Sequence, residues 1–145
     1  MVKRTPTSSL NVGLVGYGIM GAPMAHRLVE AGHRVTVLDK DADALTRATA
    51  LGCTTAPTPA ALAERSSIIL LSLPRPEHVR LVVSEGADCL LDGAIEGSVI
   101  VDTSTVDPET SRHNAGLAAE SGVGYLDCPI LGRPSNVGAW TLPVG

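Results

Sequence analysis

Three glycines near the amino terminus have the spacing of a turn that can hold phosphate groups. Gly16, Gly18 and Gly21 lie in the run Gly-Tyr-Gly-Ile-Met-Gly, directly after a short apolar segment. Gly16 lets the chain turn sharply, Gly18 lets an anion approach the backbone, and Gly21 allows close packing of the following helix. A helix that begins here presents unpaired N–H groups and a positive dipole end to the anion. The pattern therefore predicts the binding of a diphosphate.

An acidic side chain follows at the distance expected for a dinucleotide site. Asp39 ends the next apolar run, 18 residues after Gly21, where this motif places the acid that binds ribose hydroxyls. A carboxylate there repels a 2′-phosphate and favours NAD, whereas the adjacent Lys40 is a cation that suits NADP. The alternative is a tight turn in which Asp39 only caps the next helix. The predicted cofactor site here consists of Gly16, Tyr17, Gly18, Ile19, Met20, Gly21, Asp39 and Lys40.

The elements that must position these residues alternate between strands and helices. Short apolar runs predict strands over residues 11–15, 35–38, 53–56, 67–73, 98–102, 123–127 and 138–144. Helical patterns and caps predict a first helix that ends at Gly32, followed by helices over 41–51, 60–65, 77–84 and 107–120, with 86–97 as a loop. This alternation indicates an α/β fold with a Rossmann-type, doubly wound, mostly parallel sheet and helices on both faces.

Two further segments follow predicted strands and should lie beside the glycine turn. Ligands of open parallel sheets bind at the carboxyl ends of the strands, so we expect Leu73 and Pro74 near the cofactor. The alternative there is that Pro76 simply starts a helix. Ser104 and Thr105 follow another strand, and their hydroxyls either serve a ligand or cap the helix that starts at residue 107.

Composition narrows the class of protein and its partners. The 145 residues are 44% hydrophobic with a net charge of −4, which argues against a nucleic-acid surface. No apolar run is long enough to span a membrane. Residues 1–9 are expected to be a disordered tail without a signal peptide, and 10–145 one domain. Cys53, Cys89 and Cys128 are far apart, so we expect neither disulfides nor a metal site and favour the cytoplasm. The four histidines are interpreted as solvated side chains.

The run from Gly16 to Ala25, Gly-Tyr-Gly-Ile-Met-Gly-Ala-Pro-Met-Ala, resembles the extended glycine signature of the β-hydroxyacid dehydrogenases. This family includes 3-hydroxyisobutyrate dehydrogenase and 6-phosphogluconate dehydrogenase. Further similar landmarks are Ala31-Gly32-His33, Leu73-Pro74 and Asp102-Thr103-Ser104-Thr105. The resemblance covers Val12 to Gly145. It implies that the glycine segment binds the diphosphate, Asp39 the ribose and Leu73-Pro74 the middle of the cofactor. By the same resemblance, Ser104 or Thr105 lies near the nicotinamide and a small-molecule substrate.

The loop after residue 127 departs from the family pattern. Leu131 stands where the family has a serine that helps to hold the substrate, and Arg133 stands in place of a glycine. We expect Leu131, Gly132 and Arg133 at the substrate. The planar fork of Arg133 suits a carboxylate, sulfonate or phosphate, and the alternative is a solvated loop arginine.

The resemblance also implies an activity that needs more than these residues. It places the catalytic lysine, and the helical domain that pairs subunits into a homo-oligomer, beyond Gly145. Hydride transfer needs a group that takes or gives the hydroxyl proton, and we identify no such catalytic residue within the chain. The expected function is that of an NAD(P)-binding domain, inactive alone, of an oxidoreductase for a small β-hydroxy acid or its aldehyde. Alternatives are a non-catalytic dinucleotide-binding or interaction module, and a reductase of an imine or sulfonated aldehyde.

Overall fold

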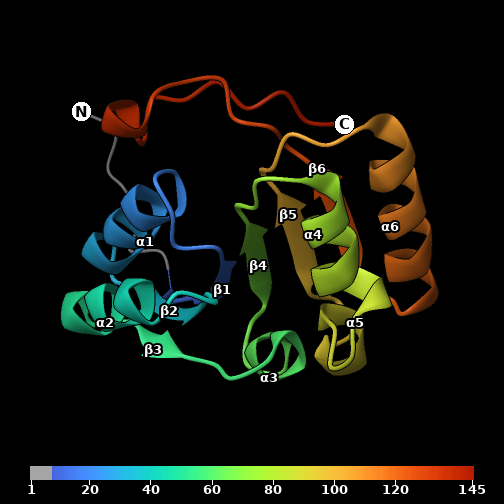
Figure 1. The fold of residues 1–145 in the computed structure, drawn as a ribbon, viewed down its shortest axis with the longest axis horizontal. Helices are drawn as coiled ribbons and strands as arrows, with labels where there is room; N and C mark the ends of the chain where they lie inside the picture. The colour runs from blue at the N-terminus through green and yellow to red at the C-terminus, as the bar shows by residue number, and fades with distance from the viewer. Residues whose placement is uncertain (1–7) are drawn as a thin grey trace.

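Six parallel strands form one sheet in the computed structural model, which describes residues 8–145. The strands are β1 Asn11–Val15, β2 Arg34–Leu38, β3 Thr54–Thr55, β4 Ile68–Leu71, β5 Val99–Asp102 and β6 Gly124–Asp127. Their order is β3-β2-β1-β4-β5-β6, and every neighbouring pair is parallel (Figure 1). The chain builds outward from the central β1 in one direction, then returns beside β1 and builds outward in the other. This is the predicted doubly wound Rossmann-type sheet.

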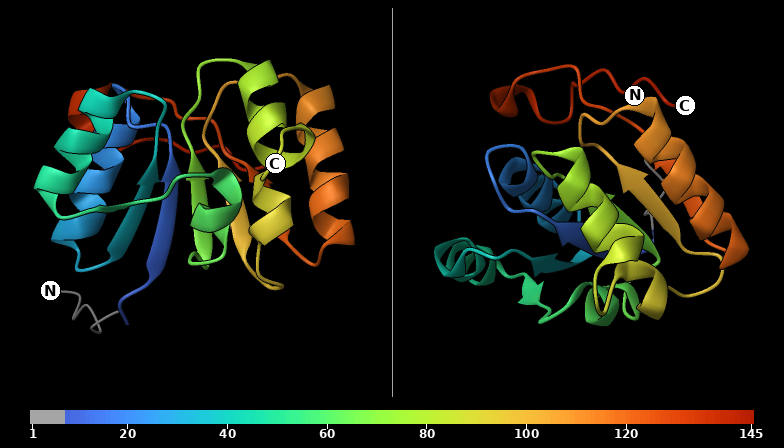
Figure 2. Two further views of the ribbon diagram at one scale, coloured as in Figure 1. Left: turned by 60° about the horizontal axis from the view of Figure 1, so that its bottom comes forward. Right: turned by 45° about the vertical axis from the view of Figure 1, so that its right-hand side comes forward.

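Helices cover both faces of this sheet, as Figures 1 and 2 show. One face carries α1 Gly21–Glu30 and α2 Ala42–Leu51. The other carries α3 Pro59–Ala63, α4 Pro76–Arg80, the π-helical turn η1 Leu81–Glu85, α5 Leu90–Gly93 and α6 Pro108–Glu120. A 3₁₀ turn, η2 Pro134–Asn136, lies in the segment after β6.

The core is aliphatic and follows the alternation of each strand. Leu14 of β1 lies level with Val37 and Leu70 on the neighbouring strands, and all three pack beneath α1 and α2. Val15 and Leu71 point the opposite way, into the cluster under α3 to α6. Because side chains alternate between faces with a period of two, adjacent residues of one strand supply both cores.

The predicted helix starts are confirmed where a side chain accepts a backbone N–H. Asp41 caps α2, Thr58 caps α3 and Asp107 caps α6, each accepting from a residue two or three positions later. Such caps satisfy N–H groups that have no partner within the helix. Gly52 ends α2 with a φ of +102°, a conformation open chiefly to glycine.

The predicted final strand over residues 138–144 is wrong. Only one isolated antiparallel bridge forms in this segment, between Leu131 and Thr141. Gly138 has a φ of +91°, outside the range of a strand, and Pro143 has no N–H to donate to a ladder. The segment instead folds back as irregular chain, and the residue after it, Gly145, donates its N–H to the carbonyl of Asp127 at 2.9 Å.

Two other expectations need correction. The segment from Cys89, expected within a loop, contains α5, because the Asp92 carboxylate accepts the Cys89 N–H at 3.0 Å and starts a helical turn. The helix expected over 77–84 runs from Pro76 to Glu85 and changes from α to π geometry at Leu81.

The expected tail over residues 1–9 is described only in part. Residues 1–7 lie outside the described residues, but the Ser9 hydroxyl donates to the Gly32 carbonyl at 2.9 Å. Across residues 8–145 no helix combines the length and the apolar character needed to cross a membrane.

Candidate functional site

The glycine turn between β1 and α1 depends on two of its glycines for packing and leaves the third exposed. Gly16 has a φ of +95°, and a Cβ there would collide with the Ser72 carbonyl. A Cβ on Gly21 would collide with the carbonyl of Gly16 itself, so this glycine lets the helix pack on the turn. Around Gly18 nothing lies within 4 Å of an added Cβ. The backbone at Gly18 is therefore open to a ligand, as the motif predicts.

Asp39 holds the glycine turn in place. Its Oδ2 accepts the Tyr17 N–H at 2.7 Å, and its Oδ1 accepts the Asp41 N–H at 2.9 Å. Because each carboxylate oxygen can accept more than one hydrogen bond, these bonds leave acceptor capacity for a ligand. The Tyr17 side chain is 5% exposed and packs in the core under α1 and α2. Burial raises the pKa of the Tyr17 phenol.

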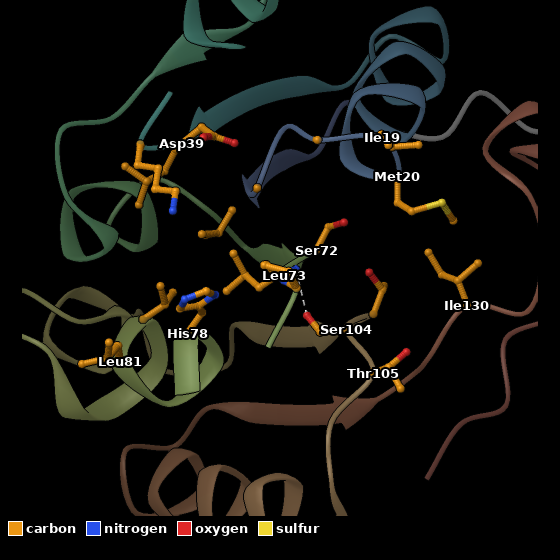
Figure 3. A pocket seen from close by; sticks show the side chains of 18 of the residues that line it. Ile19, Met20, Asp39, Ser72, Leu73, His78, Leu81, Ser104, Thr105 and Ile130 are labelled. Atoms are coloured by element: carbon orange, nitrogen blue, oxygen red, sulfur yellow. Dashed lines mark hydrogen bonds between the residues drawn. The ribbon is translucent and has the colours of Figure 1, made fainter. Parts of the chain in front are cut away.

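A cavity of about 790 Å³ lies at the carboxyl ends of the strands and joins the predicted segments (Figure 3). The glycine turn, the end of β2, the β4–α4 loop and the β5–α6 loop all contribute to its lining. The predicted site residues that line it are Gly16, Gly18, Ile19, Met20, Asp39, Lys40, Leu73, Pro74, Ser104 and Thr105. Gly21 and Tyr17 are not among its lining residues. The volume is in the range of pockets that bind small molecules and cofactors.

The β4–α4 loop is fixed to the β5–α6 loop across the floor of the cavity. The Leu73 N–H donates to the Ser104 hydroxyl at 3.0 Å. Leu73 and Pro74 line the cavity, while Pro76 occupies the first turn of α4. Pro76 therefore starts a helix, as the alternative states, while contact of Leu73 and Pro74 with a cofactor stays a prediction.

A buried carboxylate organises the β5–α6 loop from below. Asp102 is fully buried, with Oδ1 accepting the Ser104 N–H at 2.9 Å and Oδ2 the Tyr125 hydroxyl at 2.7 Å. Burial raises the pKa of the Asp102 carboxyl, and the two hydrogen bonds oppose that shift. Burial and the neighbouring Asp102 carboxylate raise the pKa of Tyr125. The chain of bonds from Tyr125 to Leu73 thus sets the position of the Ser104 hydroxyl.

Ser104 and Thr105 do not cap α6, because Asp107 does so with bonds to the N–H and hydroxyl of Thr110. Those bonds lower the pKa of the Asp107 carboxyl. Thr105 is exposed and faces the cavity, whereas Ser104 is 4% exposed. The capping alternative for these two hydroxyls is therefore wrong.

The three residues predicted at the substrate, Leu131, Gly132 and Arg133, do not line this cavity. Leu131 pairs through its backbone with Thr141, and its side chain is 60% exposed. Gly132 lies against the Trp140 ring, whose indole N–H donates to the Arg133 carbonyl at 2.7 Å. From this loop it is Ile130, not singled out by the sequence, that lines the cavity.

The sequence reasoning also missed the wall formed by α4 and η1. His78, Leu81 and Val82 line the cavity, and His78 is partly buried rather than the solvated side chain expected. Their spacing of three to four residues puts them on one helix face, and α4 starts directly after the carboxyl end of β4. The sequence signal that could have revealed this wall is the three- to four-residue spacing of these side chains in the helix that Pro76 starts. Other lining residues not predicted are Val15, Leu38, Pro57, Ser72 and Thr103.

The charged side chains of the cavity are gathered at one end. Asp39 and Lys40 directly follow β2 and line the cavity. Figure 3 shows Asp39 and His78, the latter on α4, toward the same end of the cavity. The opposite end carries Met20, Ile130 and the Thr105 hydroxyl. In residues 8–145 no group of three or more His, Cys, Asp or Glu side chains could hold a metal ion, and the three cysteines are buried free thiols.

A dinucleotide-binding domain of the Rossmann type is defined by three features found here: the order of the strands, the glycine turn and the acidic residue at the end of β2. Residues 11–143 match the family model of the NAD binding domain of 6-phosphogluconate dehydrogenase. A probable mitochondrial 3-hydroxyisobutyrate dehydrogenase of Dictyostelium discoideum is 34% identical, over 94% of this chain and 42% of its own. The 2-(hydroxymethyl)glutarate dehydrogenase of Eubacterium barkeri is also 34% identical, over 94% and 45%. The chain therefore belongs to the β-hydroxyacid dehydrogenase family, as its NAD(P)-binding domain.

Solved structures agree with this assignment. Mycobacterium tuberculosis 3-hydroxyisobutyrate dehydrogenase with L-serine superposes with a TM-score of 0.86 at 28% identity, covering 94% of this chain and 46% of that one. Psf3 in complex with NADP⁺ and 2-OPP gives 0.84 at 26% identity, covering 92% and 48%. The chain thus spans less than half the length of each of these relatives.

Proposed function

We propose that this chain is the cofactor-binding part of an oxidoreductase that transfers a hydride between a nicotinamide and a small β-hydroxy acid or its aldehyde. The observation that supports this most is the cavity itself. It brings the open backbone at Gly18, the carboxylate of Asp39 and the hydroxyl of Thr105 to one side of the sheet. Taken from the Asp39 end of the cavity to the Thr105 end, these groups suit the adenosine ribose, the diphosphate and the nicotinamide half of a dinucleotide.

Different residues bind different parts of the cofactor in this proposal. The N–H groups of the glycine turn and the start of α1 receive the diphosphate, and Ile19, at 80% exposure, covers it from the tip of the turn. Asp39 accepts the ribose hydroxyls, and Leu81 and Val82 provide an apolar wall for the adenosine half. Ser104 and Thr105 lie at the half that holds the nicotinamide. A bound NAD(P) would supply the hydride acceptor or donor.

We propose that the described residues bind cofactor but turn over little substrate. Proton transfer requires a group within hydrogen-bond reach of the substrate hydroxyl. Lys40 is the one lysine among residues 8–145, and it lies at the Asp39 end of the cavity. Catalysis, substrate choice and pairing of subunits would then depend on a second domain. The longer relatives have enough further residues to form one. Residues 10–145 form one domain in this proposal, and a cytoplasmic location stays a prediction.

NAD is the proposed cofactor, with NADP as the competing choice because Lys40 adjoins Asp39. Titration of the 145-residue chain with NADH and NADPH, followed by calorimetry, measures the preference directly. We expect NADH to bind more tightly, since the Asp39 carboxylate repels a 2′-phosphate. Equal or reversed affinities would refute the role of Asp39, and absence of binding by both would refute the function.

A second candidate, a reductase of an imine or a sulfonated aldehyde, is motivated by Leu131 and Arg133. The Arg133 side chain is exposed and forms no ion pair within residues 8–145, so its fork is available to an anionic substrate. In the full-length enzyme, Arg133→Ala should raise KM for anionic substrates and leave that for neutral ones unchanged. An unaltered KM for both kinds of substrate would show that Arg133 is a solvated loop arginine without a role in substrate binding. If the protein is only a dinucleotide-binding module, Arg133 needs no binding role. Turnover of a substrate by the full-length protein would exclude that alternative.

A further inference from the structure

A second cleft lies at the amino ends of the parallel strands, at the opposite end of the sheet from the dinucleotide cavity. It has a volume of about 410 Å³ and is formed where β1, β2 and β3 begin, whereas the larger cavity lies where β1, β2 and β4 end. Because the strands are parallel (Figure 2), the two sites are separated by the length of the strands. The residues of this cleft that carry polar side chains are Asn11, His33, Arg34, Thr36, Thr54 and Arg65.

The side chains of this cleft are rich in hydrogen-bond donors and include no carboxylate. The Nε of Arg34 donates to the Asn11 Oδ1 at 2.8 Å, which leaves the Arg34 terminal nitrogens and the Asn11 amide nitrogen to donate elsewhere. His33 Nδ1 accepts the Leu10 N–H at 3.3 Å, so its ring proton is on Nε2, a further donor. Within residues 8–145 Arg65 forms no ion pair.

These donors come from separate parts of the chain and surround the cleft. Arg34 belongs to the start of β2, Asn11 to the start of β1, and Arg65 precedes β4. The hydroxyls of Thr36 and Thr54 are 2.9 Å apart and share one hydrogen bond, and the Thr54 hydroxyl also donates to the Val35 carbonyl at 3.4 Å. The carboxyl ends of α1 and α2 lie on this side of the sheet with partial negative charge, but two guanidinium groups outweigh about half a charge from each helix. The cleft as a whole therefore attracts anions.

We propose that this cleft is a second binding site, separate from the dinucleotide cavity, for a small molecule that bears a phosphate-class oxyanion. A tetrahedral oxyanion accepts hydrogen bonds from several directions, which matches donors that arrive from three segments of the chain. Two guanidinium forks supply the paired N–H groups that such oxygens prefer. The partly buried side chain of Val29 lines the same cleft and suits an organic part of the ligand.

Inorganic pyrophosphate is the probe, titrated into the ¹⁵N-labelled 145-residue chain at constant ionic strength. We expect saturable chemical-shift changes at the amides of Arg34, Thr36 and Thr54. Arg34→Gln and Arg65→Gln should each weaken this binding by about tenfold, since each removes charge-assisted hydrogen bonds. Arg112→Gln, which removes an exposed arginine of α6, is the matched control and should leave the affinity unchanged.

The position of the shifts separates this site from the cofactor cavity, because pyrophosphate also resembles the diphosphate of a dinucleotide. Shifts confined to Gly16–Gly21, or no saturable shift at the three cleft amides, would overturn the proposal. Equal weakening by the Arg112 control would show general charge attraction and overturn it as well. NADH affinity should be the same in all three variants, and spectral dispersion confirms that each is folded.

Discussion

At the scale of single residues, the three glycines of the turn are under different constraints. Backbone carbonyls leave no room for a side chain at Gly16 or Gly21, so substitution there would damage the fold. Gly18 faces open space, and its lack of a side chain serves whatever approaches the turn. Fold and function can therefore be separated by substitution at Gly18.

Gly18→Val should leave stability nearly intact and remove cofactor binding. The new side chain meets no protein atom within 4 Å at its Cβ, but it occupies the space through which a diphosphate would reach the backbone. We expect a change in unfolding free energy within about 0.5 kcal/mol, typical of surface substitutions, and NADH affinity at least about tenfold weaker. Urea unfolding and NADH titration measure the two effects. Retained affinity would place the cofactor elsewhere.

The two tyrosines of the chain should resist ionisation in the folded state. Burial raises the pKa of Tyr17, and burial with the Asp102 carboxylate raises that of Tyr125. The unfolded chain then loses its phenolic protons first as the pH rises. Stability from these groups is complete below about pH 10 and is lost above it.

Absorbance at alkaline pH tests this expectation. Near pH 10, about half of unperturbed tyrosine is ionised, so the folded chain should show clearly less tyrosinate than the same chain in urea. Tyr125→Phe should flatten the loss of stability above that pH. It also leaves one buried Asp102 oxygen without its donor, at a cost of about 1–3 kcal/mol at neutral pH. Equal tyrosinate in both states would contradict the buried network.

At the scale of elements, the π-helical turn η1 shapes the wall of the cavity. The Gly86 N–H donates to the Leu81 carbonyl at 2.9 Å, five residues back, and this bond closes the π turn. A Cβ on Gly86 would lie 2.6 Å from that same carbonyl oxygen. Leu81 and Val82 both line the cavity, so the glycine that permits the π turn also fixes part of the wall. Such turns occur often at functional sites.

Gly86→Ala should therefore lower both stability and cofactor affinity. Overpacking against a backbone carbonyl costs about 1–3 kcal/mol, and relief of the clash would shift Leu81. Gly116→Ala is the control, because this exposed position of α6 has nothing within 4 Å of an added Cβ and alanine favours a helix by about 1 kcal/mol over glycine. Unfolding midpoints and NADH titration of both variants decide the matter. If Gly86→Ala behaves like the control, the π turn is not needed.

How far the sequence predicts these elements depends on how local their causes are. The caps at Asp41, Thr58 and Asp107 act within three residues, and all three were predictable. The change to π geometry at Leu81 was not, because it depends on how the helix packs over the sheet. The error at residues 138–144 has the same origin, since an apolar run becomes a strand only where a neighbouring strand is available to pair with it. His78 was misjudged because a lone histidine gives no sign of which way it faces.

At the scale of the whole molecule, the segment after β5 exposes several large apolar side chains. Leu126, Leu131, Leu142 and Val144 are between 39% and 63% exposed. Exposed apolar groups that gather in one region mark interaction surfaces. The relatives that are more than twice as long as this chain have further residues that could cover these apolar side chains.

Replacing Leu131 and Leu142 together by Ser should reduce self-association and dye binding by the 145-residue chain. The loss of stability should be small, because both side chains are largely solvated already. Sedimentation and fluorescence of a hydrophobic dye measure the effect, and Ile95→Ser, at the far end of the sheet and 52% exposed, is the control. An equal effect of that control would show that the segment after β5 is not special.

The position of β1 in the sheet bears on how the protein is made. β1 is an interior strand and is synthesised before the other five strands of this sheet, but one of its two neighbours, β4, begins only at Ile68. Until then a nascent chain holds β1 with one hydrogen-bonding edge open, a condition that invites pairing with other chains. Slow translation between β3 and β4 would prolong this exposure, so the yield of soluble protein should be sensitive to codon choice over residues 56–67.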